Sequence, residues 1–315
     1  MSRRAVPLVF LVLSMMVSAG TSPAAEVTAE RADGKVVVKI DGQPFAEYLV
    51  TSGQKPPLGP IVWPILGPTG KPMTRNHPMA EGPGERKDHP HHRSLWFNHG
   101  DVNGLSFWHE QTIKHREFVK VESGRRAVIV TVNDWLAPDG KKVCEDQRTL
   151  TFHADGKSRM IDFDITVKAT NGPVKFGDTK EGTFGVRVAG TMKVDAKKGG
   201  RIVNSNGQVD GAAWGKPAAW VDYQGPVDGQ TVGIAILNHP SSFRFPTYWH
   251  VRTYGLFAAN PFGLHNFKGS PEVDGSHTIA AGESITLRYR VLLHEGDEKV
   301  GRVAEAFAAY SKEVK

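Results

Sequence analysis

Cysteine is nearly absent from this chain. Cys144 is the only cysteine among 315 residues, so no disulfide can form within the molecule. The stability of the fold must therefore come from a hydrophobic core. Nothing in the segment from Lys141 to Glu145 marks the thiol as a nucleophile, and the segment resembles a strand. We expect Cys144 to be a small, half-buried structural residue.

Signals for nucleotides and nucleic acids are also missing. The chain has no glycine-rich dinucleotide loop, no phosphate loop and no alternation of strands with helices, which excludes nucleotide cofactors. The formal charge of +6 is dispersed, without a Lys/Arg run of the kind that binds nucleic acid. We expect no nucleic-acid partner, although dispersed positive charge favours anionic ligands such as uronates at low salt.

A long apolar run occurs only at the N-terminus. A charged segment, Ser2 to Arg4, precedes the apolar segment Ala5 to Val17, and small residues follow at 22–25. This pattern predicts a signal peptide over residues 1–25 and a periplasmic or secreted protein, with an uncleaved anchor as the alternative. No second run is long enough to span a membrane, so no stable membrane insertion is expected after cleavage.

Apolar and polar residues alternate through much of the remaining chain. Between Met160 and Val167, every second side chain from Ile161 onward is apolar and falls on one face. This period of two is typical of an antiparallel sheet packed on one side. Such runs predict strands at 36–40, 45–50, 119–132, 145–154, 159–169, 182–192, 231–238 and 284–294.

The intervals between these runs complete the prediction. Residues 52–84 are too rich in proline for central strands and predict a long loop, and 194–217 reads as an excursion. Only the tail, 300–314, has helical spacing. We predict an all-β fold, an antiparallel β-sandwich that forms a single domain over residues 26–315 and ends in a short helix.

The segment from Asp88 to Glu110 concentrates polar chemistry. It holds five of the thirteen histidines beside acidic, guanidinium and indole groups. Imidazole titrates near neutral pH, and indole offers a flat face for ring-shaped ligands. A packed core does not need this mixture, so the segment predicts the floor of a site. Its members include His89, His91, His92, Arg93, Trp96, His99, Asp101, Trp108 and His109.

A metal centre is the alternative use of these histidines. On a strand, His89 and His91 would share a face and meet one metal, with His92 facing away. Pro90 makes a loop or an edge strand more compatible with the sequence. The spacing matches no closed zinc site, so we expect no cofactor, and a divalent metal on His89 and His91 remains the alternative.

Two further segments carry candidate residues. Glu181 lies between Asp178 and a run that begins at Gly182, which suits a general acid or base at a sheet rim. Arg187 follows at even spacing and is expected on the same face. His250 and Arg252 lie in a second segment rich in histidine, arginine and aromatic residues, 238–268, and the two segments are expected to line one cleft.

Long motifs resemble a known family. They are LGPTGKPMTRNHPM, DHPHHRSLWFNHGDVNG, KEGTFGVRVAG, NHPSSFRFPTYWHVRTYGLFAANPFG and LRYRVLLHEG. Over about Val27 to Tyr310 the chain resembles the DUF6807 family, also labelled the "methane oxygenase PmoA" family. The methane-oxidising membrane subunit that shares the label is built from transmembrane helices, which this chain lacks, so we do not carry methane oxidation across. The family is similar to the galactose-mutarotase-like β-supersandwich group, in which histidines and a carboxylate line a sugar site.

Residues and resemblance together predict an exported carbohydrate-active protein, an enzyme of epimerase, lyase, hydrolase or mutarotase type that uses His/Glu acid-base chemistry. The expected ligand is a carbohydrate, acidic sugars included. The alternatives are a non-catalytic carbohydrate-binding protein and a metal-dependent enzyme. The catalytic candidates are His91, His92 and Glu181, and the binding candidates are His89, Arg93, Trp96, Asp101, Trp108, Arg187, His250 and Arg252.

Overall fold

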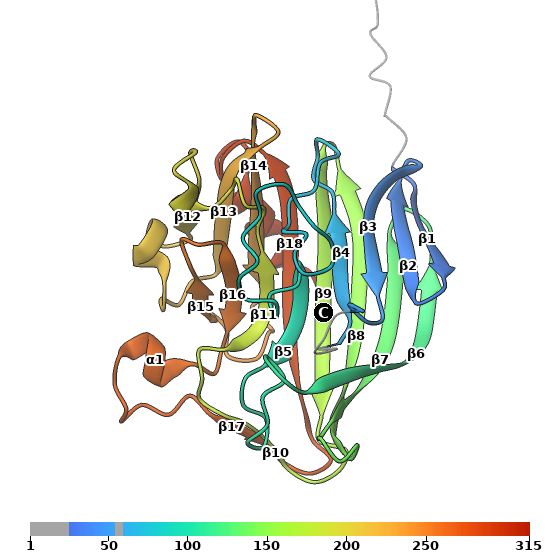
Figure 1. Ribbon diagram of the computed structural model, residues 1–315, viewed down its shortest axis with the longest axis vertical. Coiled ribbons are helices and arrows are strands. Elements are labelled where there is room, and N and C mark those ends of the chain that lie inside the picture. Colours follow the sequence, from blue (N-terminus) through green and yellow to red (C-terminus); the bar gives the residue numbers. More distant parts are fainter. Residues whose placement is uncertain (1–24, 54–58) are drawn as a thin grey trace, which may run out of the picture.

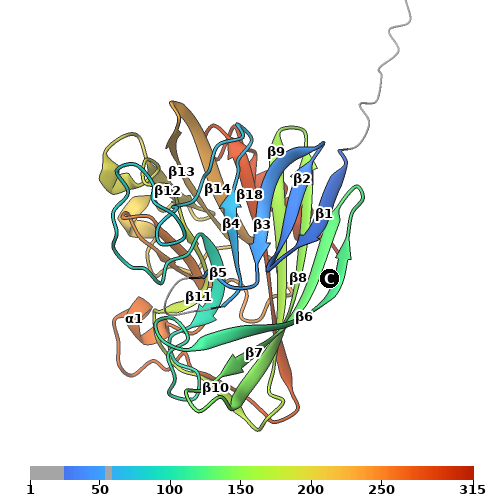
Figure 2. The ribbon, with the colours of Figure 1, turned by 45° about the vertical axis from the view of Figure 1, so that its right-hand side comes forward.

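Two large sheets face each other in the computed structural model, which describes residues 25–53 and 59–315. Each sheet has eight strands, and each pairing between neighbouring named strands is antiparallel. Figures 1 and 2 show the two layers from directions 45° apart. The predicted signal peptide, apart from its last residue, lies outside the described residues.

The first sheet places strands from both halves of the chain side by side. Its order is β1 (Val27–Ala32), β2 (Lys35–Ile40), β3 (Gln43–Leu49), β4 (Ile61–Ile65), β5 (Leu95–His99), β11 (Gly182–Arg187), β16 (Leu256–Asn260) and β15 (Tyr248–Val251). The neighbours β5, β11 and β16 therefore bring three distant segments together. All three of the polar segments singled out in the sequence belong to this part of the sheet.

The second sheet supports the first from behind. Its order is β12 (Arg201–Asn204), β13 (Trp220–Val227), β14 (Gln230–Asn238), β18 (Ser284–Glu295), β9 (Ser158–Lys168), β8 (Lys142–Asp155), β7 (Ala127–Leu136) and β6 (Thr112–Glu122). A small separate sheet pairs β10 (Val174–Phe176) with β17 (His277–Ile279). The helix α2 (Val303–Tyr310) packs on apolar side chains of β9, β14 and β18.

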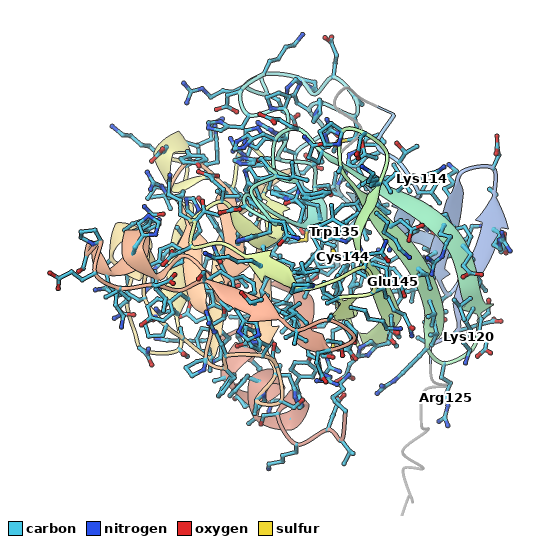
Figure 3. All side chains as sticks on the ribbon, turned by 90° about the horizontal axis from the view of Figure 1, so that it is seen from below. Lys114, Lys120, Arg125, Trp135, Cys144 and Glu145 are labelled. Atoms are coloured by element: carbon cyan, nitrogen blue, oxygen red, sulfur yellow. The ribbon has the colours of Figure 1, made fainter. Side chains whose placement is uncertain are left out.

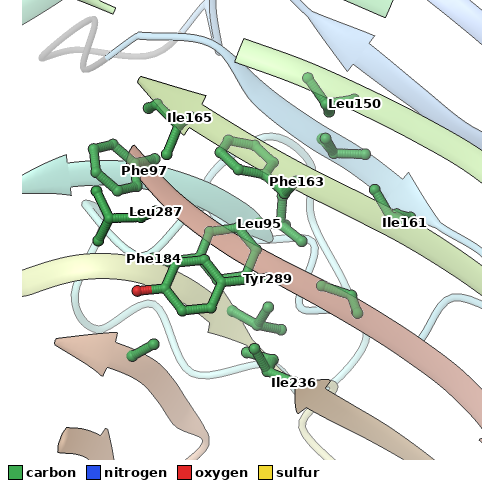
Figure 4. Packing of buried hydrophobic residues seen from close by; sticks show 14 of the residues in the cluster. Leu95, Phe97, Leu150, Ile161, Phe163, Ile165, Phe184, Ile236, Leu287 and Tyr289 are labelled. Atoms are coloured by element: carbon green, nitrogen blue, oxygen red, sulfur yellow. The ribbon is translucent and has the colours of Figure 1, made fainter. Parts of the chain in front are cut away.

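Aromatic and aliphatic side chains fill the space between the large sheets. Phe97 and Phe184 come from the first sheet, whereas Phe163 and Tyr289 come from the second, and all four are buried (Figure 4). The rings of Phe184 and Tyr289 are stacked with centroids 4.8 Å apart. Burial of such rings is the dominant favourable contribution to folding, and it fixes which face of each strand points inward.

The single cysteine belongs to this interior. Cys144 pairs with Trp135 across β7 and β8, and both side chains are buried, whereas Lys120 and Arg125 lie toward the solvent on and just after β6 (Figure 3). Burial raises the pKa of the Cys144 thiol well above its usual value. Cys144 is thus fully buried rather than half-buried.

The all-β antiparallel prediction and the C-terminal helix are confirmed, with local corrections. Residues 119–132 form parts of two strands, β6 and β7, because the turn around Ser123 and Gly124 divides them. The proline-rich loop contains β4, whose ladder with β5 joins only Ile61 and Val62, before Pro64. The excursion carries β12 and two 3₁₀ turns, Val194–Ala196 and Asp210–Ala213. A second short helix, α1 (Leu264–Lys268), was not predicted.

No helix within residues 25–53 and 59–315 is long and apolar enough to cross a membrane.

Candidate functional site

A row of outward-facing residues crosses the first sheet. The strand registers pair Trp96 with Gly185, Gly185 with Ala258, and Ala258 with His250. Side chains alternate between the two faces of a strand, so these four share the face opposite the core residues Phe97, Phe184, Ala259 and Trp249. Histidine and tryptophan thus flank two very small residues, which leave room on this face for the ring of Trp96.

Gly185 is required by the close approach of an indole. A Cβ at this position would lie 2.5 Å from Cζ2 of Trp96, closer than real side chains come. Trp96 therefore lies flat over the backbone of β11. It supports the ring of His92, whose centroid lies 5.5 Å from it at an interplanar angle of 15°. The glycine sets how deeply the histidine cluster sits.

The histidine-bearing segment before β5 is held by a buried guanidinium. Arg75 donates to the backbone carbonyls of Arg86, Asp88, His89 and His92 and forms an ion pair of 2.6 Å with the Asp88 carboxylate. Arg75 comes from the proline-rich segment and is 3% exposed. One side chain thus satisfies several carbonyl groups of an irregular segment and fixes its path.

The Asp88 carboxylate sits between two buried guanidinium groups. It accepts from Arg75 at 2.6 Å and from Arg187 at 3.1 Å. Partial burial acts to raise the pKa of Asp88, but Arg187 and Arg75 outweigh it, and the pKa is lowered. Asp88 is therefore ionised at neutral pH and anchors Arg187 beside His92.

A cavity of about 330 Å³ opens over this face. Its lining comes from four separate segments and is almost entirely polar or charged. The lining residues are His89, His91, His92, His109, Lys180, Glu181, His250, Arg252 and Tyr254. The structure therefore brings both predicted histidine-rich segments and Glu181 to one cavity.

His92 is held in one tautomer by Arg187. The Nη1 atom of Arg187 lies 2.8 Å from Nδ1 of His92. A guanidinium only donates, so Nδ1 must accept and the ring proton resides on Nε2. Burial lowers the pKa of His92 well below its usual value, and the charges of His91 and Arg187 add to the effect. His92 is a neutral ring with one N–H donor.

His250 is held in the opposite tautomer. Its Nδ1 atom lies 2.7 Å from the backbone carbonyl oxygen of Lys180. A carbonyl only accepts, so Nδ1 carries the proton and Nε2 keeps a free lone pair. Burial lowers the pKa of His250 to about 4, although the Glu181 carboxylate acts in the opposite direction. The cavity thus combines a neutral donor imidazole with a neutral acceptor imidazole.

The other histidines form an aromatic stack at the mouth. His89 stacks on both His92 and Tyr254, with ring centroids 4.9 Å and 5.4 Å away and interplanar angles of 9° and 11°, and the rings of His92 and Tyr254 are themselves parallel with centroids 6.5 Å apart. His91 meets His92 and His109 edge-on, each at 4.4 Å. Burial, followed by the charge of His109, lowers the pKa of His91 to about 3. His91 is uncharged at neutral pH.

Charged side chains occupy the opposite wall. The Glu181 carboxylate lies 3.2 Å from the Lys180 ammonium and has a 27% exposed side chain. Arg252 lines the same cavity, with its guanidinium carbon 5.7 Å from the ring centroids of both Trp214 and Tyr254. The cavity therefore presents two cations and one carboxylate besides its neutral imidazoles.

Five predicted binding residues are absent from the cavity lining. Trp96 and Trp108 are 3% and 0% exposed, so they support the histidines from below and offer no open face. Arg187 is buried behind His92.

Arg93 and Asp101 are also turned away from the cavity. Arg93 is buried and donates to the Pro90 carbonyl and the Ser52 hydroxyl. Asp101 closes a turn by accepting from the Gly104 amide at 2.9 Å. Asp178, which precedes Glu181 in the sequence, accepts from the backbone amides of His265 and Gly275.

The metal alternative lacks a complete ligand set. In the part of the chain that the structure describes, no group of three or more His, Cys, Asp or Glu side chains is arranged to hold a metal ion. His89 directs Nδ1 toward the Asp88 carboxylate at 3.5 Å, and its ring meets that of His91 at an angle of 74°. His92 also faces the cavity, contrary to the strand geometry assumed for that alternative.

Two residues that line the cavity, Lys180 and Tyr254, were not among the predicted catalytic or binding residues. Arg75 and Asp88, which also had no predicted catalytic or binding role, hold its histidine-bearing segment. The composition around His250 was a signal for Tyr254, since it lies four residues beyond. No local pattern distinguishes Arg75 from other arginines, because its partners, apart from the His77 carbonyl, lie 11 to 17 residues away.

Comparisons with known proteins give the following similarities. A protein from Synechocystis sp. is 8% identical, with a TM-score of 0.34, over 90% of this chain and 100% of that chain. A galactose mutarotase related enzyme from Lactobacillus acidophilus is 10% identical, with a TM-score of 0.28, over 92% of this chain and 99% of that chain. No curated protein matches the chain. The model of DUF6807, a family of unknown function, matches residues 35–308, and the chain therefore belongs to the DUF6807 family.

Proposed function

We propose that this protein is an exported enzyme that acts on a carbohydrate by proton transfer between a bound sugar and two neutral histidines. The observation that carries the proposal is the pair of opposite tautomers at one cavity. His250 offers a lone pair on Nε2, and His92 offers an N–H on Nε2. An acceptor and a donor that face one ligand are what acid-base chemistry needs.

In the proposed step, His250 Nε2 accepts a proton from a sugar hydroxyl or from an acidic C–H bond. Its ring then becomes an imidazolium, which the nearby Glu181 carboxylate stabilises electrostatically. Because the pKa of His250 is about 4, the acceptor is available throughout the neutral range.

His92 supplies the complementary half of the step. Its Nε2–H donates toward the sugar oxygen on which negative charge develops, either a ring oxygen or a carbonyl oxygen. As this N–H donates, negative charge develops on the imidazole ring of His92. The Arg187 guanidinium, with Nη1 at 2.8 Å from Nδ1, stabilises that charge. Arg187 is therefore a positioning residue that acts through His92, and it makes the neutral ring a better donor.

The polarity of the lining favours a hydroxyl-rich ligand. The cavity is bordered by imidazole, ammonium, guanidinium and carboxylate groups, with Tyr254 as its aromatic member. A sugar presents several hydroxyl groups, each able to donate and accept, on a partly apolar ring. The cavity matches such a ligand better than it matches an apolar molecule, which would leave these groups without partners.

The proposal is tested by proton NMR of a panel of neutral and acidic sugars in D2O, with and without the protein. Faster exchange between anomers indicates mutarotation, and new deuterium at carbon indicates epimerisation or elimination. H250Q should lower the rate roughly 100- to 10,000-fold while sugar binding is retained. Q230E, at the start of β14 and absent from the cavity lining, is a control that should leave the rate unchanged.

One outcome favours the alternative of a non-catalytic binding protein. In that case a sugar binds, shows neither anomer exchange nor isotope exchange nor cleavage, and E181Q or H250Q changes affinity only. A protein that binds no sugar at all would contradict both versions.

A further inference from the structure

Arg252 is the guanidinium group that lines the cavity, and it has no anionic partner. Within residues 25–53 and 59–315, no carboxylate forms an ion pair with it, and its guanidinium makes no hydrogen bond. Two arginines beside the cavity, Arg75 and Arg187, instead share the Asp88 carboxylate. A charged donor fork that faces a cavity without a partner is a feature of anion recognition.

Two aromatic rings hold this guanidinium in place. Its central carbon lies 5.7 Å from the ring centroids of Trp214 and of Tyr254. Cation–π contacts of this kind favour the charged group at the ring faces and leave its N–H edge free for a planar acceptor. The group is therefore ordered before a ligand arrives, which reduces the entropic cost of binding.

The remaining charge of the cavity is positive. The Glu181 carboxylate is already matched by Lys180 at 3.2 Å. His91, His92 and His250 are uncharged at neutral pH because burial lowers their pKa values. Arg252 is then a cation of the cavity without a counter-charge, and an anionic ligand would supply it.

We infer that the substrate is an acidic sugar whose carboxylate pairs with Arg252, beside the proton-transferring imidazoles of His92 and His250. The inference rests on the proposed function and adds the substrate class to it. A uronic acid carries one carboxylate on the sugar ring, at a distance from the anomeric carbon. Binding this group to Arg252 would fix the orientation of the ring in the cavity.

The experiment is titration calorimetry of the protein with D-glucuronate and D-galacturonate, each compared with its neutral parent sugar, D-glucose or D-galactose. We expect each acid to bind at least tenfold more tightly than its parent. R252M should remove this preference and leave the affinity for the neutral parent within about twofold. R125M removes an exposed arginine at the turn after β6 and should change neither affinity.

The outcomes separate the two proposals. Equal affinity of acid and parent, or equal weakening of both by R252M, overturns the acidic-sugar inference and leaves the sugar site standing. Binding of acetate as tight as that of a uronate, with no binding of neutral sugars, overturns both. A folded R252M, checked by its melting temperature, ensures that any loss of affinity reports the guanidinium itself.

Discussion

At the scale of single residues, the site depends on two hydrogen bonds that fix ring protons. Arg187 donates to Nδ1 of His92, and His250 donates from Nδ1 to a backbone carbonyl. The Arg187 guanidinium can only donate and the Lys180 carbonyl can only accept, so each partner fixes one tautomer of its histidine. Neither partner changes its protonation state near neutral pH. The two rings have complementary roles although they are the same amino acid.

The acid limb of activity should follow His250. Its pKa is lowered from 6.5 to about 4, so the lone pair is lost only as the pH falls through about 4. We expect kcat/KM to be flat with respect to this group from pH 5 to 8 and to decline toward pH 4. The measurement is a pH–rate profile on the sugar identified by NMR. An acid limb near pH 6.5 would mean that the ring is solvated and freely titrating.

Residue types predicted the site better than residue roles. The density of histidine, tryptophan and arginine identified 88–110 and 238–268, and the structure brings His91, His92, Glu181 and His250 to one cavity. Trp96 and Arg93 were predicted to bind the ligand, but both side chains are buried and support the site instead. Whether a tryptophan lies over or under its neighbours depends on Gly185, which is distant in sequence.

At the scale of elements, four strands set the shape of the cavity floor. The row Trp96, Gly185, Ala258 and His250 crosses β5, β11, β16 and β15. A larger side chain at Gly185 would displace the Trp96 indole that lies over it. The strand register therefore matters as much as the residues of the histidine segment.

Substitution of Gly185 tests this floor. In G185A the new Cβ would meet Trp96 at 2.5 Å, so the indole and the His92 ring stacked on it must move. Overpacking of this kind costs about 1–3 kcal/mol of unfolding free energy. We expect lower stability in urea unfolding together with weaker sugar binding.

The matched control is G190A, at a nearby glycine where an added Cβ meets nothing within 4 Å. It should change neither stability nor binding appreciably. If G185A were as stable and as active as G190A, the indole would not be held against β11 as described.

Element boundaries show where sequence patterns fail. Period two identified most strands of the second sheet, because each has one face on the core. The strand β4 was missed because Pro64 argues against a strand. The proline is compatible with β4 because the ladder with β5 involves only Ile61 and Val62, which precede it. The strand β5 was read as site floor, since all five of its residues are buried and no alternation marks it.

At the scale of the whole molecule, strand order creates the site. The first sheet joins β5, β11 and β16, although β5 ends at His99, β11 begins at Gly182 and β16 begins only at Leu256. Composition and alternation predicted an antiparallel β-sandwich, but not which strands are neighbours. The meeting of the two histidine-rich segments was expected, whereas the register that places His250 in the row of Trp96 required the structure.

The pH dependence of global stability should reflect the buried neutral histidines. Burial lowers the pKa of His91 to about 3 and those of His99 and His250 to about 4, compared with 6.5 for an ordinary histidine. Between about pH 4 and 6.5 the unfolded chain therefore binds more protons than the folded protein. Stability should fall as the pH falls, by at most about 1.4 kcal/mol per pH unit for each histidine.

This is measured by urea unfolding between pH 5 and 7.5, a range above the titration of ordinary carboxyl groups. H250Q should reduce the slope of unfolding free energy against pH, because one of the buried rings no longer contributes. A slope that is flat in the unsubstituted protein would show that these rings titrate in the folded protein as they do in the unfolded chain.

The most direct test of the acid-base account is nitrogen-15 NMR of the imidazole rings at pH 7, with H92Q and H250Q used to assign the signals. The account predicts two neutral rings, with the proton of His92 on Nε2 and the proton of His250 on Nδ1. It predicts in addition that R187M abolishes the tautomer preference of His92 and leaves that of His250 intact. Two rings in the same tautomer, or a charged ring at either position, would contradict the donor and acceptor roles proposed for this site.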